Sequence, residues 1–182
     1  ATASLSKFTE SESTSSPNNS VSANRLIATG SASNIDYVAS PKGTGANLAQ
    51  LPDGASSGGN KRGNYAVDWQ KDRSNANQVA SGSFAVIGGG QRNRVSGYPC
   101  STIAGGQDCT VTGGNAFVGG GYLNAANNAG ASVLAGVYNT AYQSYSTVIG
   151  NRGKTRWQGH IVFGATNDSV MGYNGGQQCG LT

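Results

Sequence analysis

Short apolar phrases followed by small residues recur along the middle of the chain at a nearly constant interval. Aligning each phrase on its last large apolar residue gives five anchors, each 15 or 16 residues after the one before: Ile87, Ile103, Val118, Leu134 and Ile149. This interval is too short for a helix pair or a propeller blade, and it matches one coil of a β-solenoid. We therefore predict an all-β fold with short-coil β-solenoid or β-roll repeats of 15–16 residues.

The apolar phrases predict strands that are apolar on both sides. Successive side chains of a strand point to opposite faces, so the five anchors are expected to form the core of the repeats. Most residues just before an anchor are also apolar: Val86, Phe117, Val133 and Val148. Because a single thin coil cannot cover both faces, we expect these four to pack against other copies of the chain in an intertwined homotrimeric fibre. The alternative is that the second face covers other segments of the same chain.

The repeat divides the chain into three expected regions. Residues 1–77 are a polar lead-in and a β-rich trimeric connector, and residues 78–152 hold the five glycine-rich units. After Arg152 the rhythm breaks, so residues 153–182 are expected to form a distal cap or tip. A cap is needed because the last coil would otherwise expose an unpaired strand edge.

The distal segment also holds the candidate receptor contacts, Trp157, His160 and Tyr173. Aromatic side chains combine an apolar face with a polar tip and are favoured in recognition, so a shallow contact patch at the tip is compatible with capping. Three copies of His160 around a three-fold axis could hold a metal ion. A lone surface histidine is the simpler interpretation, and we expect no metal site.

Composition supports a thin repetitive fold. Only 30 of the 182 residues are Leu, Ile, Val or Phe, too few for a conventional globular core. Charged residues make up 11% and the net charge is +4, which is unlike a typical disordered chain. The 29 glycines suit tight turns. Since the chain starts at Ala1 and its one methionine is Met171, we expect a processed product or an excised piece of a longer protein.

Several partners and cofactors are not expected. No apolar run approaches the ~18 residues that cross a bilayer, so membrane insertion is not predicted. The basic residues are scattered, without the basic run or aromatic platform typical of nucleic-acid binding. Three cysteines without CxxC spacing argue against a zinc site and a closed disulfide framework. We expect no cofactor, and we expect Cys100 and Cys109 to be reduced apolar fillers.

Three ordered segments carry a resemblance to a known family. They are "PKGTGANLAQLPDG" (41–54), "GGNKRGNYAVDWQ" (58–70) and "QVASGSFAVIGGGQRN" (78–93) with its successors. Together they resemble the distal part of bacteriophage tail fibres, over roughly residues 30–152. The phrases "SVLAG" at Ser132 and "STVIG" at Ser146 are also similar to the head repeats of trimeric autotransporter adhesins. The segment after Arg152 matches no cap of these families.

This resemblance implies a trimeric, β-rich fibre that acts outside the cell, on the virion, at the host surface. Its expected role is non-enzymatic: it attaches the virion to a bacterial surface glycan or an outer-membrane protein. Its other expected partner is the rest of the fibre or tail. Three identical sites per fibre would turn weak contacts into firm attachment through avidity.

Two other interpretations stay open. An autotransporter adhesin head would differ mainly in what anchors the chain. A depolymerising tailspike would need paired carboxylates. Asp68 and Asp72 are candidates for such a pair, but solvation of these carboxylates, or pairing with Lys61, Lys71 and Arg73, is the simpler expectation. With one histidine and no Ser/His/Asp arrangement, we expect no catalytic residues.

Overall fold

The computed structural model describes residues 8–13, 23–29, 31–36, 38–164 and 171–173. The chain divides after Ser40 into two compact units, each described here by itself. In the first unit, β1 (Phe8–Ser13) and β2 (Ala23–Ala28) form an antiparallel pair, with Phe8 opposite Ala28.

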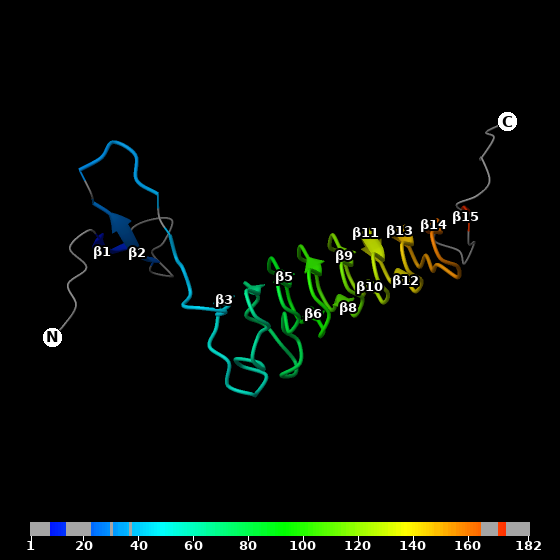
Figure 1. The fold of residues 1–182 in the computed structure, drawn as a ribbon, viewed down its shortest axis with the longest axis horizontal. Helices are drawn as coiled ribbons and strands as arrows, with labels where there is room; N and C mark the ends of the chain where they lie inside the picture. Colours follow the sequence, from blue (N-terminus) through cyan, green and yellow to red (C-terminus); the bar gives the residue numbers. More distant parts are fainter. Residues whose placement is uncertain (1–7, 14–22, 30, 37, 165–170, 174–182) are drawn as a thin grey trace. The chain divides into compact units, whose positions relative to one another are not determined.

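The second unit is a stack of coils whose strands form two sheets (Figure 1). The order of the long sheet is β15-β14-β13-β11-β9-β7-β5-β4-β3, parallel except for the β14–β15 pair. Its strands are β3 (Asn47–Leu48), β4 (Val67–Asp68), β5 (Val86–Ile87), β7 (Thr102–Ile103), β9 (Phe117–Val118), β11 (Ser132–Val137), β13 (Thr147–Asn151), β14 (Ile161–Gly164) and β15 (Met171–Tyr173). The short sheet has parallel strands in the order β12-β10-β8-β6. They are β6 (Arg94–Val95), β8 (Thr110–Val111), β10 (Ala125–Ala126) and β12 (Thr140–Ala141).

From β5 to β13 the chain alternates between the two sheets, so each coil contributes one strand to each. Each strand pairs in parallel with its equivalent in the next coil, as Ile87 does with Ile103. The described residues contain no helix. The predicted all-β solenoid is confirmed, and the coils continue beyond 78–152, through β4 on one side and β14 on the other.

The core lies between the two sheets and consists of two rows of buried apolar side chains, one row from each sheet. Its fully buried members on the long sheet are Ile87, Ile103, Val118, Val133, Val148 and Val162. Their pairing is in register from strand to strand. On the short sheet they face a second buried row: Val95, Val111, Ala126 and Ala141.

The predicted register is wrong in the last two repeats. Leu134 is 44% exposed and Ile149 is half-buried, whereas Val133 and Val148, predicted to face sister chains, are fully buried. Val133 pairs with Val148, but the next pair is Ala135 with Ile149, so Leu134 is an extra residue at a β-bulge. Aligning on the last apolar residue of each phrase therefore shifted the register by one residue, which exchanges the two faces of a strand.

The outer side of the long sheet still carries many large apolar residues. Val86 and Phe117 lie on this side, half-buried, as predicted. We call this surface the apolar face; its large apolar residues are Val67, Trp69, Val86, Phe117, Leu134, Ile149, Ile161 and Phe163. Four of them are strongly exposed: Trp69 at 53%, Leu134 at 44%, Ile161 at 40% and Phe163 at 61%.

Buried asparagines connect the coils at one corner. The Nδ2 atom of Asn124 donates to the carbonyl oxygens of Gly120 and Gly136, each at 2.7 Å, and its Oδ1 accepts from the Asn139 backbone at 2.9 Å. Asn93 and Asn139 make the same three bonds in their own coils. We call these three residues the asparagine ladder.

The ladder explains why glycine occupies this corner. Gly121 has a φ of +91°, and a Cβ atom there would lie 1.9 Å from the carbonyl oxygen of Gly136. Only glycine lets consecutive coils approach this closely while the carbonyl groups point at the asparagines.

A buried ion cluster occupies the upstream end of the core, where Asp68 takes the core position. Its carboxylate lies 2.7 Å from Nε of Arg62 and 3.2 Å from Nη2 of Arg73, and all three side chains are buried. Because a buried charge is stable only when paired, the cluster fixes the loops that precede the first complete coil.

Candidate functional site

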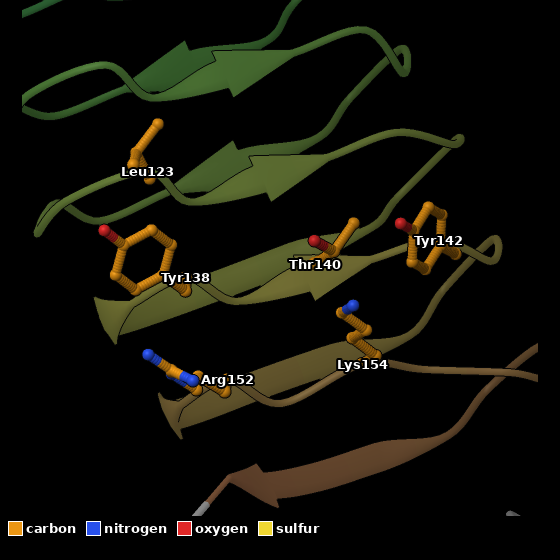
Figure 2. Close-up of a pocket in the computed structure, with 6 residues that line it drawn as sticks. All are labelled: Leu123, Tyr138, Thr140, Tyr142, Arg152 and Lys154. Carbon is orange, nitrogen blue, oxygen red and sulfur yellow. The ribbon is translucent and has the colours of Figure 1, made fainter. Parts of the chain in front are cut away.

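A groove lies on the outer side of the short sheet, towards its downstream end (Figure 2). Its lining residues are Leu123, Tyr138, Thr140, Tyr142, Arg152 and Lys154. They come from three consecutive coils, so the groove is built by the repeat itself.

One side of the groove is a column of corner residues with left-handed backbone conformation: Leu123, Tyr138 and Arg152 have φ of 52°, 59° and 58°. This conformation costs roughly 1–2 kcal/mol in residues other than glycine, so the structure must hold it in place. The Leu123 backbone N–H donates to Gln107, that of Tyr138 to Tyr122, and that of Arg152 to Val137, at 2.9–3.0 Å.

The floor of the groove consists of outward-facing residues of the short sheet. Thr140 bridges to Lys154 in the next coil, and both side chains face outward because Ala141 and Thr155 occupy the buried positions beside them. Tyr142 stands two residues after Thr140 and so lies on the same side of the sheet. Its backbone N–H donates to Oγ1 of Thr155 at 2.9 Å. The backbone of Tyr142 is therefore held by a hydrogen bond, while the residue as a whole is 45% exposed.

The ring of Tyr138 is held between two neighbours. The guanidinium carbon of Arg152 lies 5.5 Å from its centroid, a cation–π distance. On the other side, the ring of Tyr122 meets it edge to face with 5.6 Å between centroids. Such contacts restrict the ring, so Tyr138 offers a preorganised aromatic surface.

The groove is cationic. Of its lining residues Arg152 and Lys154 are charged, and none is acidic. A second hollow adjoins it at Leu123 and is lined by Asn75, Asn77, Gln78, Arg92, Arg94, Asp108, Thr110 and Leu123. There Asp108 pairs with Arg92 through two bonds of 3.0 and 3.1 Å, whereas Arg94 forms no ion pair with a described residue. We call the two hollows together the short-sheet groove.

The sequence-predicted tip residues do not form this site. Trp157 is 67% exposed, and the side chain of Tyr173 lies outside the described residues. His160 is buried, with 9% of its surface exposed, so its burial contradicts the predicted receptor contact. The reason is register: His160 stands two residues before Val162, where the other coils place inward-facing residues such as Ala131 and Ser146.

The candidate carboxylate pair is not assembled either. Asp68 is fully buried and bonded to Arg62 and Arg73, while Asp72 is exposed. Pairing with Arg73 is confirmed, and Arg62 is a partner that the sequence reading missed. A carboxylate locked between two guanidinium groups in the core cannot reach a substrate in solvent.

Within the described ranges there is no cluster of three or more His, Cys, Asp or Glu residues that could hold a metal ion. The same ranges contain no helix long and apolar enough to span a membrane. Cys100 and Cys109 are both free thiols. Cys109 is buried, as predicted for an apolar filler, whereas Cys100 is exposed, so the predicted filler role of Cys100 is wrong.

The residues of the short-sheet groove were missed because they follow the corrected register. Leu123 and Tyr138 stand five residues after the core residues Val118 and Val133, and Arg152 stands four after Val148. When the residues are counted from Leu134 and Ile149, Leu123, Tyr138 and Arg152 fall at different distances from their anchors. The column is therefore not apparent with the predicted anchors. With the bulge recognised, the repeat itself predicts that they stack.

Comparison with known proteins does not assign the chain, since no family model, curated protein or solved structure matches it.

Proposed function

We propose that this chain is a non-enzymatic structural and adhesion module of a bacteriophage tail fibre. In this proposal it assembles as a homotrimer and attaches the virion to a bacterial surface glycan or outer-membrane protein. The resemblance of residues 41–54, 58–70 and 78–93 to distal tail-fibre segments supports the assignment. A repetitive β-solenoid suits a rigid spacer that presents the same surface several times.

The observation that carries the proposal is the apolar face. Consecutive strands place their outward residues in register, as Val67 with Val86 and Ile149 with Phe163, so the face forms a stripe of apolar side chains interrupted by Thr102, Ser132 and Thr147. Exposed stripes that include Trp69, Leu134 and Phe163 are unusual on soluble monomers and typical of interfaces. Three copies around an axis parallel to the stack would cover all three stripes with one repeated contact.

The two sides of the coil then have separate roles. The core lies between the two sheets, so the short-sheet groove faces away from the apolar face. A trimer built on the apolar face would leave three copies of the groove open to solvent. Three weak sites on one rigid body would bind a surface of repeated receptors with high avidity.

The groove supports binding rather than hydrolysis. Glycoside hydrolysis uses two carboxyl groups flanking the bond that breaks. The one acidic residue lining the short-sheet groove, Asp108, forms a two-bond pair with Arg92. The groove thus offers aromatic rings, hydroxyl groups and cations, which recognise a ligand without cleaving it.

Binding of the labelled chain to a panel of intact bacteria tests this proposal, together with a reducing-sugar assay on their surface polysaccharides. We expect saturable binding to some strains without sustained release of reducing sugar. The variant Leu134→Asp, which puts a charge on the apolar face, should lower the apparent affinity for cells more than tenfold through lost avidity. Continuous product release, or cell binding that Leu134→Asp leaves unchanged, would overturn it.

A further inference from the structure

We propose that the short-sheet groove binds an extended segment of an acidic glycan. The inference rests on the proposed adhesive function and narrows its receptor to polysaccharide that carries carboxylate or phosphate groups. Sugar rings would stack on Tyr138 and Tyr142, and the acidic groups would pair with Arg152, Lys154 and Arg94.

The charge of the groove favours an anionic ligand. Four cations line it, Arg92, Arg94, Arg152 and Lys154, against one acidic residue, Asp108, which leaves a formal excess of +3. The whole chain has a net charge of +4, so most of its excess lies along this groove. A surface with unpaired arginine and lysine side chains attracts anions, and the planar guanidinium group suits carboxylate and phosphate in particular.

The placement of the aromatic rings also favours a sugar ligand. Figure 2 shows Tyr138 at one side of the groove and Tyr142 at the other, with Thr140 between them. Arg152 and Lys154 follow along the neighbouring coil. The two tyrosine residues are 44% and 45% exposed, although their backbones are held by hydrogen bonds. A sugar has apolar C–H faces and an equatorial belt of hydroxyl groups, so alternating rings, hydroxyl groups and cations match its surface.

The length of the groove favours a polymeric ligand over a small molecule. The outward row of the short sheet runs from Arg94 through Thr110, Ala125 and Thr140 to Lys154, one residue per coil. At ~4.8 Å per coil, this row spans roughly 19 Å. An open groove of that length can contact several consecutive sugar units, and few of its contacts would be available to a monosaccharide.

A single-stranded nucleic acid is also a polyanion with rings that stack, but the groove fits it less well. Such binding sites usually offer a series of aromatic platforms along the strand. Here the two tyrosines lie across the groove, and its remaining lining is rich in hydroxyl and amide groups, from Thr110, Thr140, Asn75, Asn77 and Gln78. These groups can form hydrogen bonds with sugar hydroxyls. A single-stranded oligonucleotide therefore serves as the control ligand, because it is a polyanion that the groove should bind less well.

Titration calorimetry on the whole chain tests the proposal with four probes. They are an oligogalacturonate, a phosphorylated lipopolysaccharide-core oligosaccharide, a neutral galactan oligosaccharide and a single-stranded oligonucleotide. We expect at least one acidic oligosaccharide to bind at least tenfold more tightly than the neutral one. The double variant Arg152→Gln with Lys154→Gln should lose at least tenfold in this affinity, and Tyr142→Ala should lose affinity for every sugar probe that binds.

The matched control is Lys42→Gln with Lys71→Gln, which removes the same charge from exposed positions outside the groove. It should bind like the unaltered chain. An equal loss in both double variants, equal binding of acidic and neutral sugars, or a preference for the oligonucleotide would overturn the inference.

The same variants separate this inference from the proposed function. If Arg152→Gln with Lys154→Gln binds cells as well as the unaltered chain, the groove is not the receptor site, while the adhesive function stands. If the groove binds acidic sugars but Leu134→Asp leaves cell binding unchanged, the ligand class is right and the trimeric adhesin is wrong.

Discussion

The asparagine ladder shows how single side chains keep thin coils together. The side chains of Asn93, Asn124 and Asn139 each bond two carbonyl groups and one N–H group at the tight corner. The carbonyl groups of Gly106 and Gly136 also accept a backbone N–H. All three residues are buried, so no water replaces these bonds if the side chain is removed. In a chain with few large apolar residues, such bonds matter more than in a thick globular core.

Replacing Asn124 with alanine should therefore destabilise the fold strongly. The Gly120 carbonyl and the Asn139 N–H would each lose a hydrogen bond, at a cost of about 1–3 kcal/mol apiece, whereas the Gly136 carbonyl keeps its bond from the Tyr122 N–H. We therefore expect a loss of at least ~2 kcal/mol in the free energy of unfolding. Urea unfolding followed by circular dichroism measures it. Asn64→Ala, at an exposed asparagine outside the ladder, is the control and should change the value by less than ~0.5 kcal/mol. Equal effects of the two substitutions would show that the ladder is not stabilising.

Cys109 occupies the one ladder position between Asn93 and Asn124 that lacks an amide. Its thiol makes weak contacts with the carbonyl oxygens of Gln107 and Gly121, at 3.5 and 3.6 Å. Burial raises the pKa of this thiol, although hydrogen bonds with the Asn124 and Gln107 backbones act in the opposite direction. The thiol is thus neutral at ordinary pH and a poor substitute for an amide.

Cys109→Asn should complete the ladder and stabilise the protein. The new amide can donate to Gly105 and Gly121 as its neighbours do in their coils, and a typical net gain is about 1 kcal/mol. Thermal unfolding of the variant should show a higher midpoint. Cys109→Ser, which has a donor but cannot span both carbonyl groups, serves as the comparison. A midpoint for Cys109→Asn at or below that of the unaltered chain would contradict the predicted bonds.

At the scale of strands, the periodicity of the sequence predicted the architecture, but it did not predict for every strand which residue faces the core. The interval of 15–16 residues and the Gly-rich corners were sufficient to predict parallel β-coils, because few folds repeat over so short a distance. The phrases "SVLAG" and "STVIG" each contain two or more adjacent candidates for the core position. Periodicity cannot tell which one faces inward, since a bulge at Leu134 changes the count by one residue.

The corrected register predicts opposite effects at two adjacent residues. Val133→Ala removes a fully buried side chain and should cost about 1–3 kcal/mol in the free energy of unfolding. Leu134→Ala trims an outward side chain that is 44% exposed in the single chain, so it should mainly weaken association. Unfolding measured below the concentration at which the chains associate separates the two effects. A larger loss of unfolding free energy for Leu134→Ala under that condition would show that Leu134, and not Val133, faces the core.

The candidate site shows what sequence could not supply at the residue level. Trp157 and His160 were conspicuous because the chain has only two tryptophans and one histidine, yet His160 lies in an inward row. The groove residues Tyr138, Arg152 and Lys154 are unremarkable one by one. They become a site only because stacked coils bring positions about 15 residues apart side by side, and that requires the correct register.

At the scale of the whole molecule, the apolar face and the short-sheet groove are proposed to have different roles. Apolar residues gather on the outer side of the long sheet, while hydroxyl groups, amides and cations line the groove on the short sheet. We interpret the first as the contact between sister chains and the second as the surface offered to a receptor. Without sister chains, Trp69, Leu134, Ile161 and Phe163 would stay exposed to water, which opposes solubility.

Sedimentation equilibrium of the unaltered chain at micromolar concentration tests this claim most directly. Three chains of 18.3 kDa give a mass of about 55 kDa, the value that the account predicts. Leu134→Asp should shift the distribution towards smaller species while the β-type circular dichroism spectrum persists. A folded, stable species of 18.3 kDa for the unaltered chain would contradict the account, because the apolar face would then be stable while exposed to solvent.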